Sequence, residues 1–238
     1  MQFHPDKCSV MHITTKKNPI HHKYVLHQHT LQTESSTKYL GVTIQSDLKW
    51  NKHIDNISST ASKHLNFIKR NLKVNSKSVK EKAYTSLIRP KLEYSSCVWD
   101  PHTKSNISKF EMVQRRAARY TCNIFHNTST VTNMLTELKW PQIQLRRTRT
   151  RLIFFCKIIY HLVAIYPTNL PVPSDSRTRQ YTHIHSYRHI HTSLDSYKYS
   201  FYPKTIVQWN LLPAAAVQCP TLDSFKEQIP LSVLQQHI

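Results

Sequence analysis

Glycine, acidic residues and long apolar runs are all scarce in this chain of 238 residues. Its five cysteines are widely spaced and odd in number, which excludes a dense disulfide scaffold and indicates reduced thiols. The most apolar stretch, residues 152–166, is interrupted by Lys157 and His161 and is shorter than the ~20 residues that span a bilayer. The N-terminal stretch carries Asp6 and Lys7 where a signal peptide would be apolar. We therefore expect an intracellular protein, nuclear or cytoplasmic, with no membrane span.

The scarcity of acidic residues leaves the chain strongly positive. Lysine and arginine number 33 against 13 aspartates and glutamates, which gives a net charge of +20 and a pI of about 9.9. A charge of about 2–8 already keeps a small domain soluble, so a merely solubilising basic surface is the weaker explanation. A polyanionic partner, usually nucleic acid, or an anionic membrane surface explains the excess better. Because 39% of the residues are hydrophobic, we also expect a folded core.

Residue patterns predict an α+β fold with a short β region at the start. Alternating and β-branched residues predict strands over 10–14 and 24–26, which turn residues around Pro19 would join into an antiparallel pair. Apolar residues at helical spacing then predict a mostly helical region. Expected helices cover 53–72, 78–90, 105–125 and 141–166, the last being the longest, and a short helix opens at Thr221. Residues 167–198 have no helical period and are predicted to be irregular.

The same spacing predicts how the helices begin and which residues face the core. Ser78 and Glu81 have the spacing of a capping box at the start of the second helix. The expected inward residues are Phe110, Val113, Ala117 and Tyr120 on the third helix, and Leu145, Leu152, Phe155, Ile159 and Leu162 on the fourth.

Four stretches carry a resemblance to a known family. "YLGVTIQSDLKWNKHI", "LIRPKLEYSSCVWDP", "FEMVQRRAARY" and "SFYPKTIVQWNLLP" resemble the C-terminal third of non-LTR retrotransposon reverse transcriptases of the jockey-like group, and they occur in that family's order. The resemblance covers almost the whole chain. It implies the end of a polymerase palm with a primer-grip-like β hairpin in 1–50 and a helical thumb-like domain in 51–166. It further implies a His-rich basic linker in 167–198 and a C-terminal tail with a short helix in 199–238.

The resemblance gives the single glycine a role. Leu40–Gly41 matches a Leu-Gly pair in the hairpin where palm meets thumb, which helps to position the primer end. A glycine there would let the backbone approach nucleic acid closely. A simple bulge glycine without a nucleic-acid contact is an equally open interpretation.

The polymerase chemistry of that family is not expected here. It needs clustered aspartates that hold two divalent metal ions, whereas this chain has no adjacent acids, and its closest pair is Asp223 and Glu227. "FHPDKCSVM" resembles the family's segment after the catalytic turn, with His4 in place of the usual asparagine. Lys7 then matches the proposed general-acid lysine, as a relic. We expect no enzyme activity and no cofactor, with magnesium needed only in a full-length polymerase.

Basic residues on the expected helices are the candidate nucleic-acid contacts. Arginine offers bidentate donors to phosphate, and each neutralised phosphate releases counterions. No base reader is identifiable, so we expect backbone-led, sequence-neutral binding. A solvated helix face is the alternative reading, and the stems of Arg116 or Arg146 could simply cover the core. The candidates, besides Gly41, are Lys69, Arg70, Lys73, Arg115, Arg116, Arg119, Arg146, Arg147, Arg149 and Arg151.

Two further groups of residues have competing interpretations. The histidines in "HIHSYRHIH" (His183, His185, His189 and His191) could hold a metal ion, but with no cysteine or carboxylate among them a basic loop is favoured. Trp50, Trp99 and Trp209 could stack on bases, although core packing is favoured.

Partners follow from these readings. We expect nucleic acid, either a primer–template or RNA, and a missing palm and fingers portion of the same polyprotein is a further possible partner. The alternatives are a basic module that docks on an anionic membrane or a protein, and a relic without function.

Overall fold

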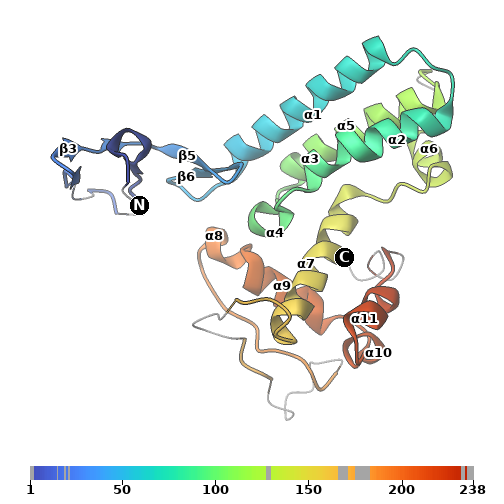
Figure 1. Cartoon of the computed structure of the whole chain (residues 1–238). Helices are drawn as coiled ribbons and strands as arrows, with labels where there is room; N and C mark the ends of the chain where they lie inside the picture. Colours follow the sequence, from blue (N-terminus) through green and yellow to red (C-terminus); the bar gives the residue numbers. More distant parts are fainter. Residues whose placement is uncertain are drawn as a thin grey trace. The chain divides into compact units, whose positions relative to one another are not determined.

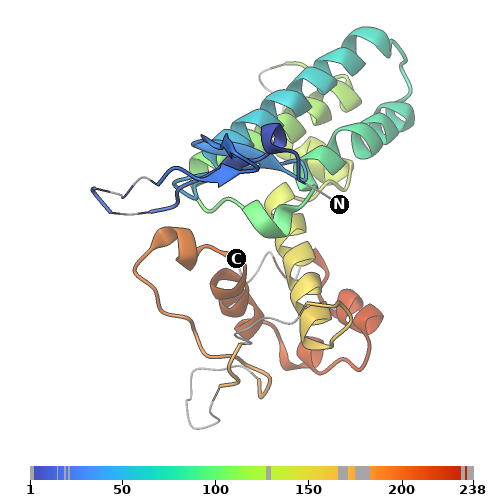
Figure 2. The ribbon, with the colours of Figure 1, turned by 60° about the vertical axis from the view of Figure 1, so that its left-hand side comes forward.

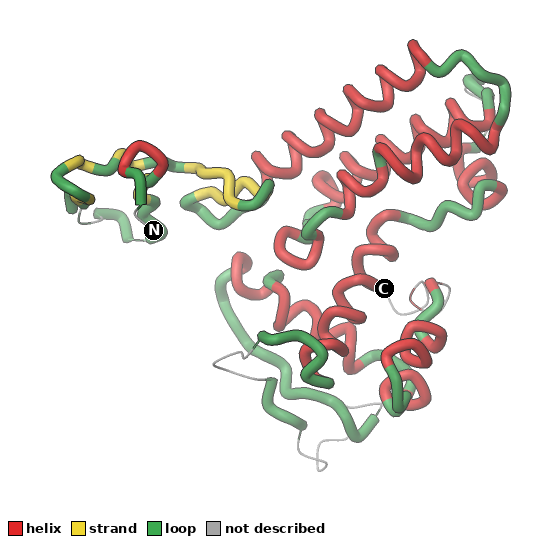
Figure 3. Tube along the Cα trace, viewed as in Figure 1, coloured by secondary structure: helices red, strands yellow, loops and turns green. Residues whose placement is uncertain are grey.

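The computed structural model describes residues 3–14, 16–18, 20, 22–126, 130–165, 171–174, 183–231 and 234. The chain divides into two compact units, Met1–Asn56 and Ile57–Ile238. The named strands lie in the first unit and most helices in the second, which confirms an α+β fold (Figure 3). Helix α1 (Asn51–Asn71) begins in the first unit and continues into the second (Figure 1).

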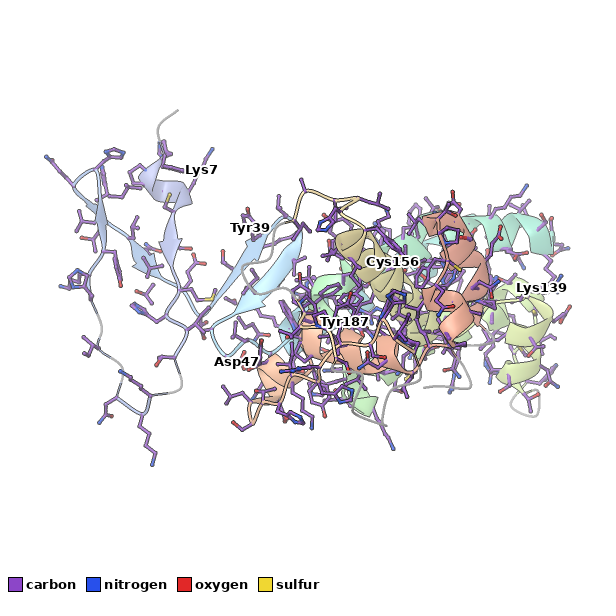
Figure 4. All side chains as sticks on the ribbon, turned by 90° about the horizontal axis from the view of Figure 1, so that it is seen from below. Lys7, Tyr39, Asp47, Lys139, Cys156 and Tyr187 are labelled. Atoms are coloured by element: carbon purple, nitrogen blue, oxygen red, sulfur yellow. The ribbon has the colours of Figure 1, made fainter. Side chains whose placement is uncertain are left out.

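The first unit consists of short strands in three two-stranded sheets. In these sheets β1 runs parallel to β4, β2 antiparallel to β3, and β5 antiparallel to β6. A short 3-10 helix precedes them and carries Lys7 (Figure 4). The elements are η1 (Pro5–Lys7), β1 (Ser9–Val10), β2 (Val25–Leu26), β3 (His29–Thr30), β4 (Gln32–Thr33), β5 (Ser36–Tyr39) and β6 (Val42–Gln45).

The predicted antiparallel pairing of residues 10–14 with 24–26 is wrong. The chain reverses immediately after β2, because His27 and Gln28 both adopt positive φ angles, 47° and 66°. This two-residue turn pairs β2 with β3 instead, and β1 finds its partner in β4, with Ser9 opposite Gln32. Two successive non-glycine residues at positive φ are uncommon, and no turn signal in the sequence announces them.

The hairpin of β5 and β6 explains why the glycine is needed. Tyr39 lies opposite Val42, so the turn consists of Leu40 and Gly41 alone. Their φ angles are 47° and 85°, and a two-residue turn with positive φ at both positions is the type I′ arrangement that matches strand twist. Near the start of β6, the backbone N–H of Thr43 donates to His53 Nδ1 at 3.1 Å, which ties the hairpin to the start of α1.

The second unit is helical. Its elements after α1 are α2 (Lys77–Leu87), α3 (Arg89–Glu93), α4 (Ser96–Trp99), α5 (Lys104–Cys122), α6 (Val131–Glu137), α7 (Ile143–Ile159), α8 (Asp195–Lys198), α9 (Phe201–Asn210), α10 (Ala214–Val217) and α11 (Leu222–Gln228). None of the helices in the described part of the chain is both long and apolar enough to cross a membrane.

The sequence predicted the main helices, and the observed helices α1, α5 and α11 confirm those predictions. The residues expected to face inward from α5 are all buried, and Thr221 caps α11 in a capping box. Two details are wrong. The cap of α2 is Ser76, which accepts from the N–H of Val79 at 3.5 Å, while Ser78 lies inside the first turn. Helix α7 ends at Ile159 and is shorter than α1, so Leu162 lies beyond it and is exposed.

Helix α7 joins the two helical groups of the second unit. Its first half meets α3, α4 and α5, and its second half meets α9, with α11 packed alongside (Figures 1 and 2). The C-terminal group has an aromatic core in which Phe155 contacts Tyr187 and Trp209 edge-on, with ring centroids 5.6 and 5.1 Å away. Figure 4 marks Cys156 on α7 beside this core and Tyr187 on the segment before α8. Trp99 and Trp209 are fully buried, which agrees with their favoured core role.

Candidate nucleic-acid interface

Two arginines of α7 lie in the interior, around one carboxylate. Arg151 donates to Asp100 and to the side chain of Gln208. Arg147 Nε lies 3.6 Å from Asp100 Oδ1, and Lys204 Nζ completes the group with a hydrogen bond to Asp100. All three cations thus converge on a carboxylate that is itself almost fully buried.

This buried cluster carries more positive than negative charge. Burial would raise the pKa of Asp100, but Arg151, Lys204 and Arg147 outweigh it and hold that pKa below its usual value. Burial lowers the pKa of Arg147 to about 10 in spite of Asp100. The Arg147 guanidinium lies over the Trp99 ring at 4.0 Å and the Phe110 ring at 4.8 Å, and these aromatic faces attract its charge.

The other two arginines of α7 fasten it to its neighbours. Arg146 forms a two-pronged ion pair with Glu93 of α3. Arg149 donates to the carbonyl oxygens of Ile229 and Lys226 at 3.1 and 2.8 Å. Carbonyl groups at the end of a helix such as α11 have no partner within the helix, and Arg149 supplies one.

The four α7 arginines therefore act as structural residues in this fold. Arg147 and Arg151 are buried, which removes them from any surface that a polyanion could reach. Arg146 and Arg149 are half-buried and already engaged. The expectation that these four contact nucleic acid needs correction, because each already has a partner more than 40 residues away in sequence.

A different set of cations gathers where the end of α1 meets α5. Tyr120 of α5 donates its hydroxyl to the carbonyl oxygen of Leu72 at 2.8 Å. Lys80 Nζ lies 4.7 Å from the Tyr120 ring centre, and Lys69 Nζ lies 6.0 Å from it. We call this surface the α1–α5 cationic face. It comprises Lys69, Arg70 and Lys73 at the end of α1 and Arg116 of α5, whereas Lys80 is buried and is not part of the face.

The charges on this face repel one another. Burial, and then the positive charge of Arg116, lower the pKa of Lys69. Arg70, Lys73 and Arg116 are exposed, and in the described part of the chain none of the three takes part in an ion pair. A phosphate placed between Lys69 and Arg116 would relieve the repulsion, which is what a backbone-binding surface requires.

Several acidic side chains of this unit pair with neighbouring residues of the helical groups. Glu111 accepts from the backbone N–H of Gln144 at 3.2 Å and so caps the start of α7. The other pairs are Glu81 with Trp140 Nε1, Glu93 with Arg146, Glu137 with Lys77, and Asp223 with Lys226. Since these carboxylates are engaged elsewhere, none of them pairs with the cations of the α1–α5 cationic face.

The remaining candidates on α5 differ in position. Arg115 is exposed and lines a groove on another side of the helix, one residue from Arg116. Arg119 is half-buried and donates to the carbonyl oxygen of His126 at 3.3 Å. Lys80 and Tyr120 are both buried, and only the tertiary fold brings Tyr120 beside Lys69.

Gly41 lies at the exposed tip of its hairpin, next to Tyr39 and Leu40, which are 64% and 73% exposed. The turn alone is a sufficient reason for a glycine. Lys7 lies in the same unit, on its 3-10 helix, and no described acid cluster accompanies it there.

Substituting Gly41→Ala is expected to loosen this hairpin. A Cβ at positive φ costs roughly 1–2 kcal/mol, which would lower the hydrogen-exchange protection of the β5 and β6 amides about tenfold. Leu40→Asn should act in the opposite direction, because asparagine tolerates this conformation better. Unchanged protection in Gly41→Ala would show that the positive φ is not needed.

The His-rich segment has a structural use for one of its histidines. His183 is buried, and its Nε2 lies 3.1 Å from the carbonyl oxygen of Trp209. Burial, the larger influence, and His185 both lower the pKa of His183. Among the described residues, no three His, Cys, Asp or Glu side chains are grouped as a metal ion would need.

The chain matches no protein-family model, and neither a curated protein nor a solved structure matches it.

Proposed function

We propose that the second unit is a helical nucleic-acid-binding domain that holds the backbone of a duplex without regard to base sequence. The observation that carries this proposal is the α1–α5 cationic face, where the partly exposed Lys69 and the exposed Arg70, Lys73 and Arg116 form no ion pair among the described residues. Phosphates are the ligand that such a surface would neutralise, and contacts to phosphate carry no sequence information.

More particularly, we propose that the chain is the palm end and thumb of a non-LTR retrotransposon reverse transcriptase without its catalytic aspartates. The support is the four ordered stretches that resemble that family, one of which, "FEMVQRRAARY", supplies Arg116 and Tyr120 of the cationic face. In this proposal the duplex is a primer–template, and the only activity that the chain retains is binding to it.

Duplex binding is tested with a variant of the α1–α5 cationic face and a matched control. The face variant is K69Q/R70Q/K73Q/R116Q, and the control, K157Q/R188Q/K198Q/K226Q, removes the same charge from elsewhere in the unit. Two labelled duplexes of unrelated sequence should bind the wild type and the control alike, and the face variant at least about tenfold more weakly. Equal binding by both variants would show that net charge alone attracts the duplex. Binding to anionic vesicles but not to duplex would support a membrane surface instead.

The lack of catalysis is a separate expectation. Purified chain mixed with a primer–template, deoxynucleotides and magnesium should extend no primer, because two metal ions need a cluster of carboxylates to hold them. A recombinant reverse transcriptase in the same buffer serves as the positive control. Magnesium-dependent extension by the chain, traced to its own peak in size-exclusion chromatography, would contradict this part of the proposal.

A further inference from the structure

A second cationic surface lies beside the first one, in a groove of about 900 Å³. The start of α5, helix α6, the connection to α7 and Leu231 line this groove, which belongs entirely to the second unit. Three exposed cations come from these walls, namely Lys104, Arg115 and Lys139. Figure 4 marks Lys139, just after α6.

The groove combines positive charge with an apolar wall. Ile107, Leu135 and Leu231 are partly exposed and contribute apolar surface. Its acid, Glu111, is engaged with the backbone N–H of Gln144, and burial raises the pKa of this carboxyl. In the described part of the chain, no ion pair involves Lys104, Arg115 or Lys139. Anionic groups beside flat apolar ones are therefore the chemistry that fits this groove.

We infer that the groove binds single-stranded nucleic acid, with phosphates on the three cations and a base against the apolar wall. Grooves that follow a single strand combine cations with apolar or aromatic surface in this way. A double helix cannot enter a groove of this volume, whereas an extended strand of a few nucleotides can. An acidic peptide would satisfy the cations but leave the apolar wall without a planar partner.

The position of the groove strengthens this assignment. Arg115 and Arg116 are consecutive on α5, so one residue faces the groove while the next belongs to the α1–α5 cationic face. A strand that leaves a duplex held on that face could continue directly into the groove. The inference goes beyond the proposed function, from which it takes only this continuity.

The test uses a 12-nucleotide oligodeoxythymidine and a blunt duplex as separate probes. The groove variant K104Q/R115Q/K139Q should bind the oligonucleotide about tenfold more weakly than wild type, and the duplex nearly as well. The matched control K157Q/R188Q/K198Q should bind both like wild type. The face variant should show the reverse pattern, which keeps failure of the groove distinguishable from failure of the duplex site.

Three results would overturn the inference. The first is unchanged oligonucleotide binding by a folded groove variant, as judged by circular dichroism. The second is an equal loss for oligonucleotide and duplex, because the groove would then make no distinction between them. The third is tight binding of a polyglutamate peptide that the oligonucleotide fails to displace.

Discussion

Asp100→Asn should be the most destabilising single polar substitution in the second unit. It removes the one carboxylate on which Arg147, Arg151 and Lys204 converge and leaves these cations buried with no counter-charge. Breaking a buried ion pair from one side costs about 3–5 kcal/mol. Urea denaturation followed by circular dichroism measures the loss as a lower midpoint. Asp223→Asn is the control, since its ion pair with Lys226 lies at the surface and should contribute little.

Two further measurements test whether the Asp100 cluster stabilises the fold. Adding Lys204→Met to the Asp100→Asn variant should recover part of the stability, because it removes one of the stranded cations. If Asp100→Asn instead melts within about 1 kcal/mol of wild type, the cluster does not stabilise the fold as the geometry indicates.

The same cluster predicts how stability depends on pH. The folded-state pKa of Asp100 lies below its ordinary value of 3.8, so its stabilisation is complete above that value and is lost as pH falls through the folded pKa. Wild type should therefore lose stability steeply in strong acid, and Asp100→Asn should lose less over the same range.

Salt should weaken duplex binding far more than most substitutions do. If the α1–α5 cationic face neutralises about four phosphates, the affinity falls with a log–log slope of about −3.6, or about 100-fold between roughly 50 and 200 mM salt. Fluorescence anisotropy at four salt concentrations measures this slope. The face variant should bind weakly with a much shallower slope, because few released counterions remain.

The charge-matched control separates specific contacts from general attraction. Its slope should equal that of wild type, since Lys157, Arg188, Lys198 and Lys226 lie outside the cationic face. A control slope as shallow as that of the face variant would mean that the duplex senses only the total charge of +20.

Sequence patterns predicted the long helices because a repeating apolar stripe is a local property. The buried faces of α1 and α5 follow from such stripes, as does the cap at Thr221. Local patterns failed at the turn of His27 and Gln28, whose positive φ angles have no glycine or asparagine to announce them. They also failed to predict α3, α4 and α6, which are too short to show a period.

The candidate site shows why arginine positions cannot be interpreted from spacing alone. Arg147 and Arg116 look alike in sequence, each one of a run of cations on a helix. One is buried because Asp100 and two aromatic rings lie against it, and the other is exposed. Lys80 is buried in the same way, because Tyr120, 40 residues further along the chain, folds against it.

Lysine footprinting with and without bound duplex tests the central proposal most directly. Brief acetylation followed by mass spectrometry reports which amines the nucleic acid covers. We predict that duplex protects Lys69 and Lys73 strongly and leaves Lys157 and Lys198 as reactive as before. Unchanged reactivity of Lys69 and Lys73 in a sample with the duplex fully bound would contradict the proposal and move the interface to whichever lysines are protected.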